Sequence, residues 1–126
     1  MKIINNFING KCTSSSDEIL PVYNPSTGEK IAEVTCSNEE DFKNTIISSK
    51  QSQISWSQTT PLKRSRILSK YKDLIEKNIE ELGKLVSIEH GKTLDDAKAS
   101  VTRGMEVVEF ACGIPHLLKG DFSKNV

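Results

Sequence analysis

The stretch TPLKRSRILSKYKDLIEKNIEELGKLVSIEHG, residues 60–91, decides the fold that we expect for this chain. Its apolar side chains recur at spacings of three and four, which places them on one face of an α-helix. Thr60 suits the N-cap, Pro61 suits the first helical position, and Gly91 suits the C-terminal cap. The stretch therefore predicts one long helix over residues 61–90 with one face on a core.

Two further helices are expected beside it. Ser37 and Glu40 have the spacing of a capping box, and the weakly amphipathic pattern that follows predicts a helix over residues 38–54. Thr93 begins another helix, which the periodicity extends over residues 94–113. This last helix is apolar on two faces, so we expect both faces to be covered by protein.

The first 36 residues have another pattern, in which short apolar runs alternate with turns. NFINGKC contains Asn9-Gly10, a dipeptide that favours a two-residue hairpin because both positions tolerate positive φ. EILPVY and KIAEVTC predict further strands, and Pro21 should lie at a sheet edge because proline cannot donate to the ladder. The expected fold class is α+β, with strands over residues 1–36, three α-helices within residues 37–113 and an irregular end over residues 114–126.

The composition describes a globular chain. The 17 basic and 17 acidic residues cancel, and no apolar run approaches the roughly 20 residues that span a bilayer. The start, MKIINNFING, lacks the features of a secretory signal. Basic residues early in the 60–91 stretch are followed at once by glutamates, so we interpret this face as solvated. We expect a cytoplasmic protein with no membrane or nucleic-acid partner.

The residues themselves disclose little chemistry. The three cysteines are an odd number with no CxxC pair, which favours buried thiols over disulfides or a metal site. The alternative, Cys112 as a nucleophile with His90 or His116 as its base, has no motif to support it. No glycine-rich phosphate loop, GxSxG elbow or HExxH motif occurs in the sequence. These patterns predict no catalytic, cofactor-binding or metal-binding residue within the chain.

An ordered set of segments carries a family resemblance. They are FINGK, NPSTGE, KIAEV, Trp56, RSRIL, IEELGKLVSIEHGKTL and DDAKASV. In this order they resemble the N-terminal portion of the aldehyde dehydrogenase superfamily, over essentially all 126 residues. VTRGMEVVEFACG, residues 101–113, resembles the CoA-acylating methylmalonate-semialdehyde dehydrogenase branch, where an RG followed by a VVEFA-like run is characteristic.

The resemblance implies an activity for the intact enzyme. Enzymes of this branch use NAD+ and coenzyme A to oxidise malonate or methylmalonate semialdehyde with loss of carbon dioxide, releasing acetyl-CoA or propionyl-CoA in valine and inositol catabolism. The resemblance also implies that the intact enzyme is a homo-oligomer, and we expect a tetramer. The family's nucleophilic cysteine, glycine-rich cofactor segment and oxyanion asparagine lie beyond the portion that this chain matches, and Cys112 does not occupy the nucleophile's place.

Two expectations follow for the chain as given. It is a partial aldehyde dehydrogenase domain that neither binds NAD+ nor turns over semialdehydes alone, because it lacks the βαβ crevice that holds a pyrophosphate. The alternative is a non-catalytic helical interaction module derived from an aldehyde dehydrogenase.

Arg103 is the one candidate substrate-binding residue. From helical geometry alone its partner is Glu106, three residues on. The resemblance instead implies that Arg103 holds the substrate's carboxylate, with Val107 and Phe110 near its stem.

Overall fold

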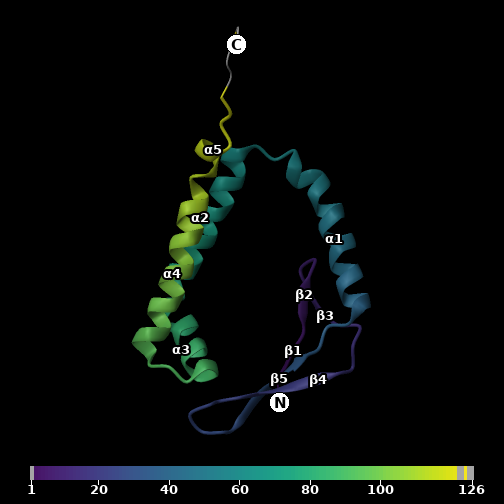
Figure 1. The fold of residues 1–126 in the computed structure, drawn as a ribbon, viewed down its shortest axis with the longest axis vertical. Helices are drawn as coiled ribbons and strands as arrows, with labels where there is room; N and C mark the ends of the chain where they lie inside the picture. The colour runs from purple at the N-terminus through teal and green to yellow at the C-terminus, as the bar shows by residue number, and fades with distance from the viewer. Residues whose placement is uncertain (1, 122–123, 125–126) are drawn as a thin grey trace. The chain divides into compact units, whose positions relative to one another are not determined.

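The computed structural model describes residues 2–121 and residue 124, which fall into two units (Figure 1). One unit contains Met1–Gln58 and Val86–Lys92. The other contains Thr59–Leu85 and Thr93–Val126. The first unit holds all the strands and the first helix of the described residues, and the second is built from helices alone. The expected α+β class, strands first and helices after, is confirmed.

The strands of the first unit form a hairpin and a small sheet. They are β1 (Ile3–Ile4), β2 (Asn6–Ile8), β3 (Lys11–Thr13), β4 (Ile19–Tyr23) and β5 (Lys30–Thr35). Strands β2 and β3 pair antiparallel around Asn9 and Gly10, whose φ angles of 50° and 75° are those of the expected hairpin turn. The prediction for NFINGKC is therefore confirmed.

The sheet has the order β1-β5-β4, with β1 parallel and β4 antiparallel to β5. Because β4 lies at an edge, Pro21 sits where a missing N–H is tolerated, as expected. A bulge between Val22 and Tyr23 shifts the register next to this proline. The pairing of β1 with β5 joins residues about thirty positions apart, and no local sequence pattern predicts this pairing.

Helix α1 (Glu39–Ser57) corrects the predicted start and end of the first helix. Its N-cap is Asn38 and not Ser37: the Asp41 N–H donates to Asn38 Oδ1 at 3.0 Å, and the Asn38 N–H donates to Asp41 Oδ2 at 3.2 Å. Asp41 also accepts from the Ser15 N–H at 2.7 Å. The capping pair moved by one residue because Asp41, unlike Glu40, reaches both the helix start and the loop before β4.

The long helix predicted over residues 61–90 is interrupted. The structure has α2 (Pro61–Lys77) and α3 (Ile79–His90) instead. Asn78, with φ −109° and ψ 17°, separates them, and its side-chain amide donates to the Leu74 carbonyl at 2.7 Å. Asparagine competes in this way with helical hydrogen bonds. The apolar periodicity runs on through the break, which is why it predicted one helix.

Both expected caps of this stretch are confirmed. Thr60 Oγ1 accepts from the Lys63 N–H at 3.4 Å, with Pro61 in the first helical position. Gly91 follows α3 at φ 77°, and an added Cβ there would lie 2.8 Å from Pro25 Cγ. Gly91 is therefore required by its backbone angle and by the close approach of the turn after β4.

Helix α4 (Leu94–Cys112) packs antiparallel beside α2 within the second unit (Figure 1). Ala97 is fully buried, and the Ser65 hydroxyl at the start of α2 donates to the Cys112 carbonyl at the end of α4, at 2.5 Å. The final helix, α5 (Ile114–Leu117), also contacts α2. We expected an irregular segment from residue 114; the structure has this helical turn first, and residues 122–123 and 125–126 lie outside the described part.

Candidate functional site

The rotation of α4 about its own axis is set by contacts at both ends. Near its start, Lys98 Nζ lies 2.7 Å from Glu80 Oε1 of α3. Gly83 lets the Lys98 stem approach closely, because a Cβ at Gly83 would lie only 2.7 Å from Lys98 Cγ. The Ser65 bond to the Cys112 carbonyl holds the other end. These contacts turn the face that contains Ala97 toward α2 and leave the opposite face outward.

Helical spacing predicts two surface ion pairs in the 60–91 stretch, Lys72 with Glu76 and Glu80 with Lys84, because each pair is four residues apart. In the structure, Glu80 pairs with Lys98 of α4 instead of Lys84. Its hydrogen bond raises the pKa of Lys98 above the usual 10.5, against a smaller opposing effect of desolvation. The expected pair of Lys72 with Glu76 does form, at 3.2 Å, and raises the pKa of Lys72 by the same kind of hydrogen bond.

Arg103 lies on the outward face of α4 and is exposed. Val107 and Phe110, one and two turns further, share this face at 69% and 70% exposure. Among the described residues, Arg103 makes no hydrogen bond or ion pair, and the surface pair with Glu106 does not form. We call Arg103, Val107 and Phe110 the outward face of α4. It presents one unpaired guanidinium beside two apolar side chains, an arrangement suited to a small anion with an apolar part.

The cysteines and histidines do not assemble a catalytic or metal site in the part of the chain that the structure describes. Cys112 is half-buried, and its thiol donates to the Val108 carbonyl of its own helix at 3.3 Å. Within residues 2–121, no group of three or more His, Cys, Asp or Glu side chains is placed to hold a metal ion. None of the described helices has both the length and the apolar character that crossing a bilayer demands.

The described residues do not fit a nicotinamide cofactor. The one parallel strand pair in this part of the chain, β1 with β5, is connected through strands and turns and not through a helix. A dinucleotide site needs a strand, a glycine-rich turn and a helix whose N-terminus faces the pyrophosphate. We therefore derive no chemical step through a nicotinamide from these residues.

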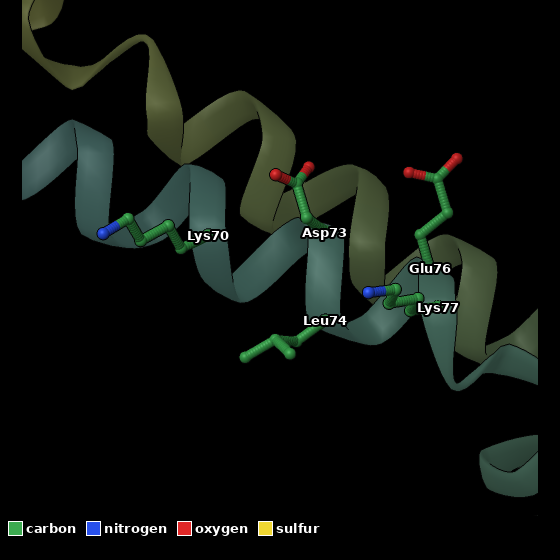
Figure 2. Close-up of a pocket in the computed structure, with 5 residues that line it drawn as sticks. All are labelled: Lys70, Asp73, Leu74, Glu76 and Lys77. Carbon is green, nitrogen blue, oxygen red and sulfur yellow. The ribbon is translucent and has the colours of Figure 1, made fainter.

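A shallow hollow of about 560 Å³ lies on the outer side of α2 and was missed by the sequence reasoning (Figure 2). Its lining comes from one helix: Lys70, Asp73, Leu74, Glu76 and Lys77. The side chain of Leu74 points away from α4, and the charged groups around it are of both signs. The spacing of 70, 74 and 77 places these residues on one helical face, which is the only signal that could have found the hollow. It contains no pairing of nucleophile and base.

Comparison with known proteins places these features in a family. Residues 12–125 match the aldehyde dehydrogenase family. The malonate-semialdehyde dehydrogenase of Pseudomonas aeruginosa is 39% identical over 126 residues, which cover 100% of this chain and 25% of that protein. The chain thus spans about a quarter of the length of the curated relatives that it matches.

Solved structures of similar proteins agree in fold. The methylmalonate-semialdehyde dehydrogenase from Oceanimonas doudoroffii superposes with a TM-score of 0.96 at 36% identity, covering 100% of this chain and 26% of that one. A protein from Sinorhizobium meliloti 1021, described as a methylmalonate-semialdehyde dehydrogenase and complexed with NAD, gives a TM-score of 0.95 at 39% identity, covering 98% and 26%. The chain belongs to the aldehyde dehydrogenase family.

Proposed function

We propose that this chain is the N-terminal part of an NAD-dependent, CoA-acylating semialdehyde dehydrogenase. The enzyme would oxidise malonate or methylmalonate semialdehyde with coenzyme A and NAD+ and release acetyl-CoA or propionyl-CoA, carbon dioxide and NADH. The relatives named as malonate- and methylmalonate-semialdehyde dehydrogenases support this substrate class, and the NAD complex of one of them supports the cofactor. The proposal includes a cytoplasmic homotetramer for the intact enzyme, and no activity or NAD+ binding by residues 1–126 alone.

The observation that carries the proposal is the unpaired Arg103 on the outward face of α4. A guanidinium among exposed apolar side chains needs an anion once that face is covered, because a desolvated and unpaired charge is costly. Its planar, two-toothed geometry matches a carboxylate. The substrates that distinguish this branch from plain aldehyde dehydrogenases carry a carboxylate on the carbon next to the aldehyde. We therefore assign Arg103 to the recognition of that carboxylate.

The test is a chimera in which this chain replaces the matched quarter of the Oceanimonas doudoroffii enzyme. In this chimera, Arg103→Leu should lower kcat/KM for methylmalonate semialdehyde by roughly 30- to 1,000-fold, which corresponds to losing about 2–4 kcal/mol of charge-assisted binding. The value of kcat/KM for propanal, which has no carboxylate, should stay within about twofold. An equal loss on both aldehydes would make Arg103 a structural residue.

The amount of exposed surface is compatible both with the enzyme part and with a second candidate function, a non-catalytic helical interaction module. The chain exposes 9848 Å², whereas two separate compact units of about 7 kDa would expose about 8,000 Å². Such an excess fits a polypeptide that packs against more protein, as both readings require. The chimera distinguishes the two functions. If the chain were a module that no longer supports catalysis, the chimera would turn over neither methylmalonate semialdehyde nor propanal.

A further inference from the structure

Asp41 is a buried carboxylate that joins two segments of the first unit. Only 3% of its surface is exposed. Its Oδ1 accepts from the Ser15 N–H at 2.7 Å, and its Oδ2 accepts from the Asn38 N–H at 3.2 Å. Each oxygen of the carboxylate therefore accepts from a backbone donor, one in the loop between β3 and β4 and the other at the start of α1 (Figure 1).

The loop of residues 14–17 is held against α1 through both peptide groups of Ser15. The Ser15 N–H donates to Asp41, and the Ser15 carbonyl accepts from the Asn38 side-chain amide at 3.1 Å. Ser14 Oγ accepts from the Ser16 N–H at 3.0 Å and donates to the Ser16 carbonyl at 3.1 Å. These last bonds shape the loop but do not attach it to the helix, so the attachment depends on Asp41 and Asn38.

The hold of Asp41 on the loop depends on its charge. An ionised carboxyl group accepts on both oxygens, whereas a protonated one carries a hydroxyl in place of one acceptor. Protonation also removes the charge that strengthens both hydrogen bonds. The N-cap bond of α1, from the Asp41 N–H to Asn38 Oδ1 at 3.0 Å, does not involve the carboxyl group and is kept at any charge.

The surroundings of Asp41 favour its ionised form. Its pKa lies below the usual 3.8, mainly because the Ser15 N–H stabilises the charge; burial opposes this effect and the Asn38 N–H adds to it. Among the described residues, the hollow beside Asp41, between β2 and α1, has no other ionisable side chain in its lining. The ionisable side chains along the neighbouring segments are exposed, so water screens their charges; they are Lys11, Cys12, Asp17, Glu18, Glu39, Glu40 and Lys43.

We propose that Asp41 is a pH-sensitive clamp: its ionised carboxylate holds residues 14–17 on the N-terminal end of α1, and its protonation loosens this loop while α1 and the strand pairs stay folded. The far end of the loop stays on the sheet, because the Cys36 N–H donates to the Glu18 carbonyl at 2.8 Å. The clamp is at full strength above pH 3.8 and is lost as the pH falls through the lower pKa of the folded state.

The experiment is amide hydrogen exchange and a pH titration of the 126-residue chain, both followed by ¹H–¹⁵N NMR. At pH 6, Asp41→Asn should raise the exchange rate of the Ser15 amide by about 10-fold or more, because a charge-assisted bond is lost. Amides in the middle of α1 should change less than about twofold. Glu40→Gln, which removes an exposed carboxylate one residue away, is the matched control and should leave the Ser15 exchange rate unchanged.

The titration of the wild type tests the same proposal without a substitution. As the pH falls from 6, the Ser15 amide shift should follow a single midpoint below 3.8, and the far-UV circular dichroism of the helices should persist through that midpoint.

Three results would overturn the proposal. One is a Ser15 exchange rate that is the same in Asp41→Asn and the wild type. Another is loss of the loop and of α1 at the same pH, which would make Asp41 a residue that supports the whole fold. If Asp41→Asn does not fold, the wild-type titration decides alone, and a Ser15 amide shift with no midpoint below 3.8 is the third.

Discussion

Gly83 and Gly104 are both glycines inside helices, yet only one of them is explained by the chain. Gly83 is buried, and a Cβ there would press on the Lys98 stem at 2.7 Å. Gly104 is exposed, and a Cβ there would meet nothing. The same contrast divides the two faces of α4, since the face on α2 includes the fully buried Ala97 while the outward face exposes most of Phe110. Packing within the chain accounts for the inner face, whereas nothing among the described residues covers the outward one.

The largest effect is expected from a substitution in the face of α4 that packs on α2. Ala97→Asp places a carboxylate at a position with 0% exposure. We expect it to lower the free energy of unfolding by about 3 kcal/mol or more, since a buried unpaired charge is among the most destabilising changes. Urea unfolding followed by far-UV circular dichroism measures this loss.

The matched control is Ala99→Asp, two residues away on an exposed position of the same helix. It should change the free energy of unfolding by no more than about 0.5 kcal/mol. If both variants unfold at the same urea concentration, α4 does not pack on α2 through Ala97, and the assignment of the two faces fails.

The next effect compares the two glycines directly. Gly83→Val should lower the free energy of unfolding by about 1–3 kcal/mol, because the new side chain on α3 would push the side chains of Lys98 and Leu94 of α4 away. Gly104→Val should change it by less than about 0.5 kcal/mol, because the space is open and valine is no worse than glycine in a helix. The same urea titration applies, and equal losses would remove the contrast between the two positions.

The smallest effect concerns the ion pair that fixes α4. Glu80 raises the pKa of Lys98, so the pair stabilises the fold fully below pH 10.5 and loses this contribution as the pH rises through the higher pKa of the folded state. The melting temperature of Glu80→Gln should lie slightly below that of the wild type near neutral pH. The difference should close above pH 10.5, and a difference that persists there would assign the effect of Glu80 to something other than Lys98.

Much of the fold follows from local signals in the sequence. Asn9-Gly10 supplies the two positive φ angles of the hairpin, Thr60-Pro61 marks the start of α2, and Gly91 ends α3. Each is a case in which one residue type satisfies a backbone requirement that few others can. The strand-to-helix change at residue 36 was visible as a change of apolar period.

The errors have a common physical origin in contacts that a local pattern does not contain. Asn78 breaks the long helix with a side-chain bond to a backbone carbonyl, while the apolar spacing continues past it. Asp41 displaced the expected cap because it also binds the Ser15 N–H, 26 residues earlier. Glu80 forms its ion pair with Lys98 and not with Lys84 because α3 and α4 approach each other at Gly83.

The candidate site was only partly accessible from the sequence. Helical spacing brought Arg103, Val107 and Phe110 to one face, and the structure agrees with that placement. The sequence of residues 1–126 does not show what covers this face, because the pattern of a helix that is apolar on two sides does not identify its second packing partner. The open space at Gly104 likewise needed coordinates, since a sequence does not distinguish a glycine that is closely packed from one that is not.

The most direct test of the central claim, that Arg103 binds a substrate carboxylate, is inhibition of the chimera by malonate, which carries carboxylates and no aldehyde. With propanal as the substrate, turnover can be measured in the wild type and in Arg103→Leu alike. The inhibition constant of malonate should rise roughly 10- to 100-fold in Arg103→Leu, because a hydrogen-bonded charge pair is worth about 1.5–3 kcal/mol. An inhibition constant that is the same in both proteins would contradict the account.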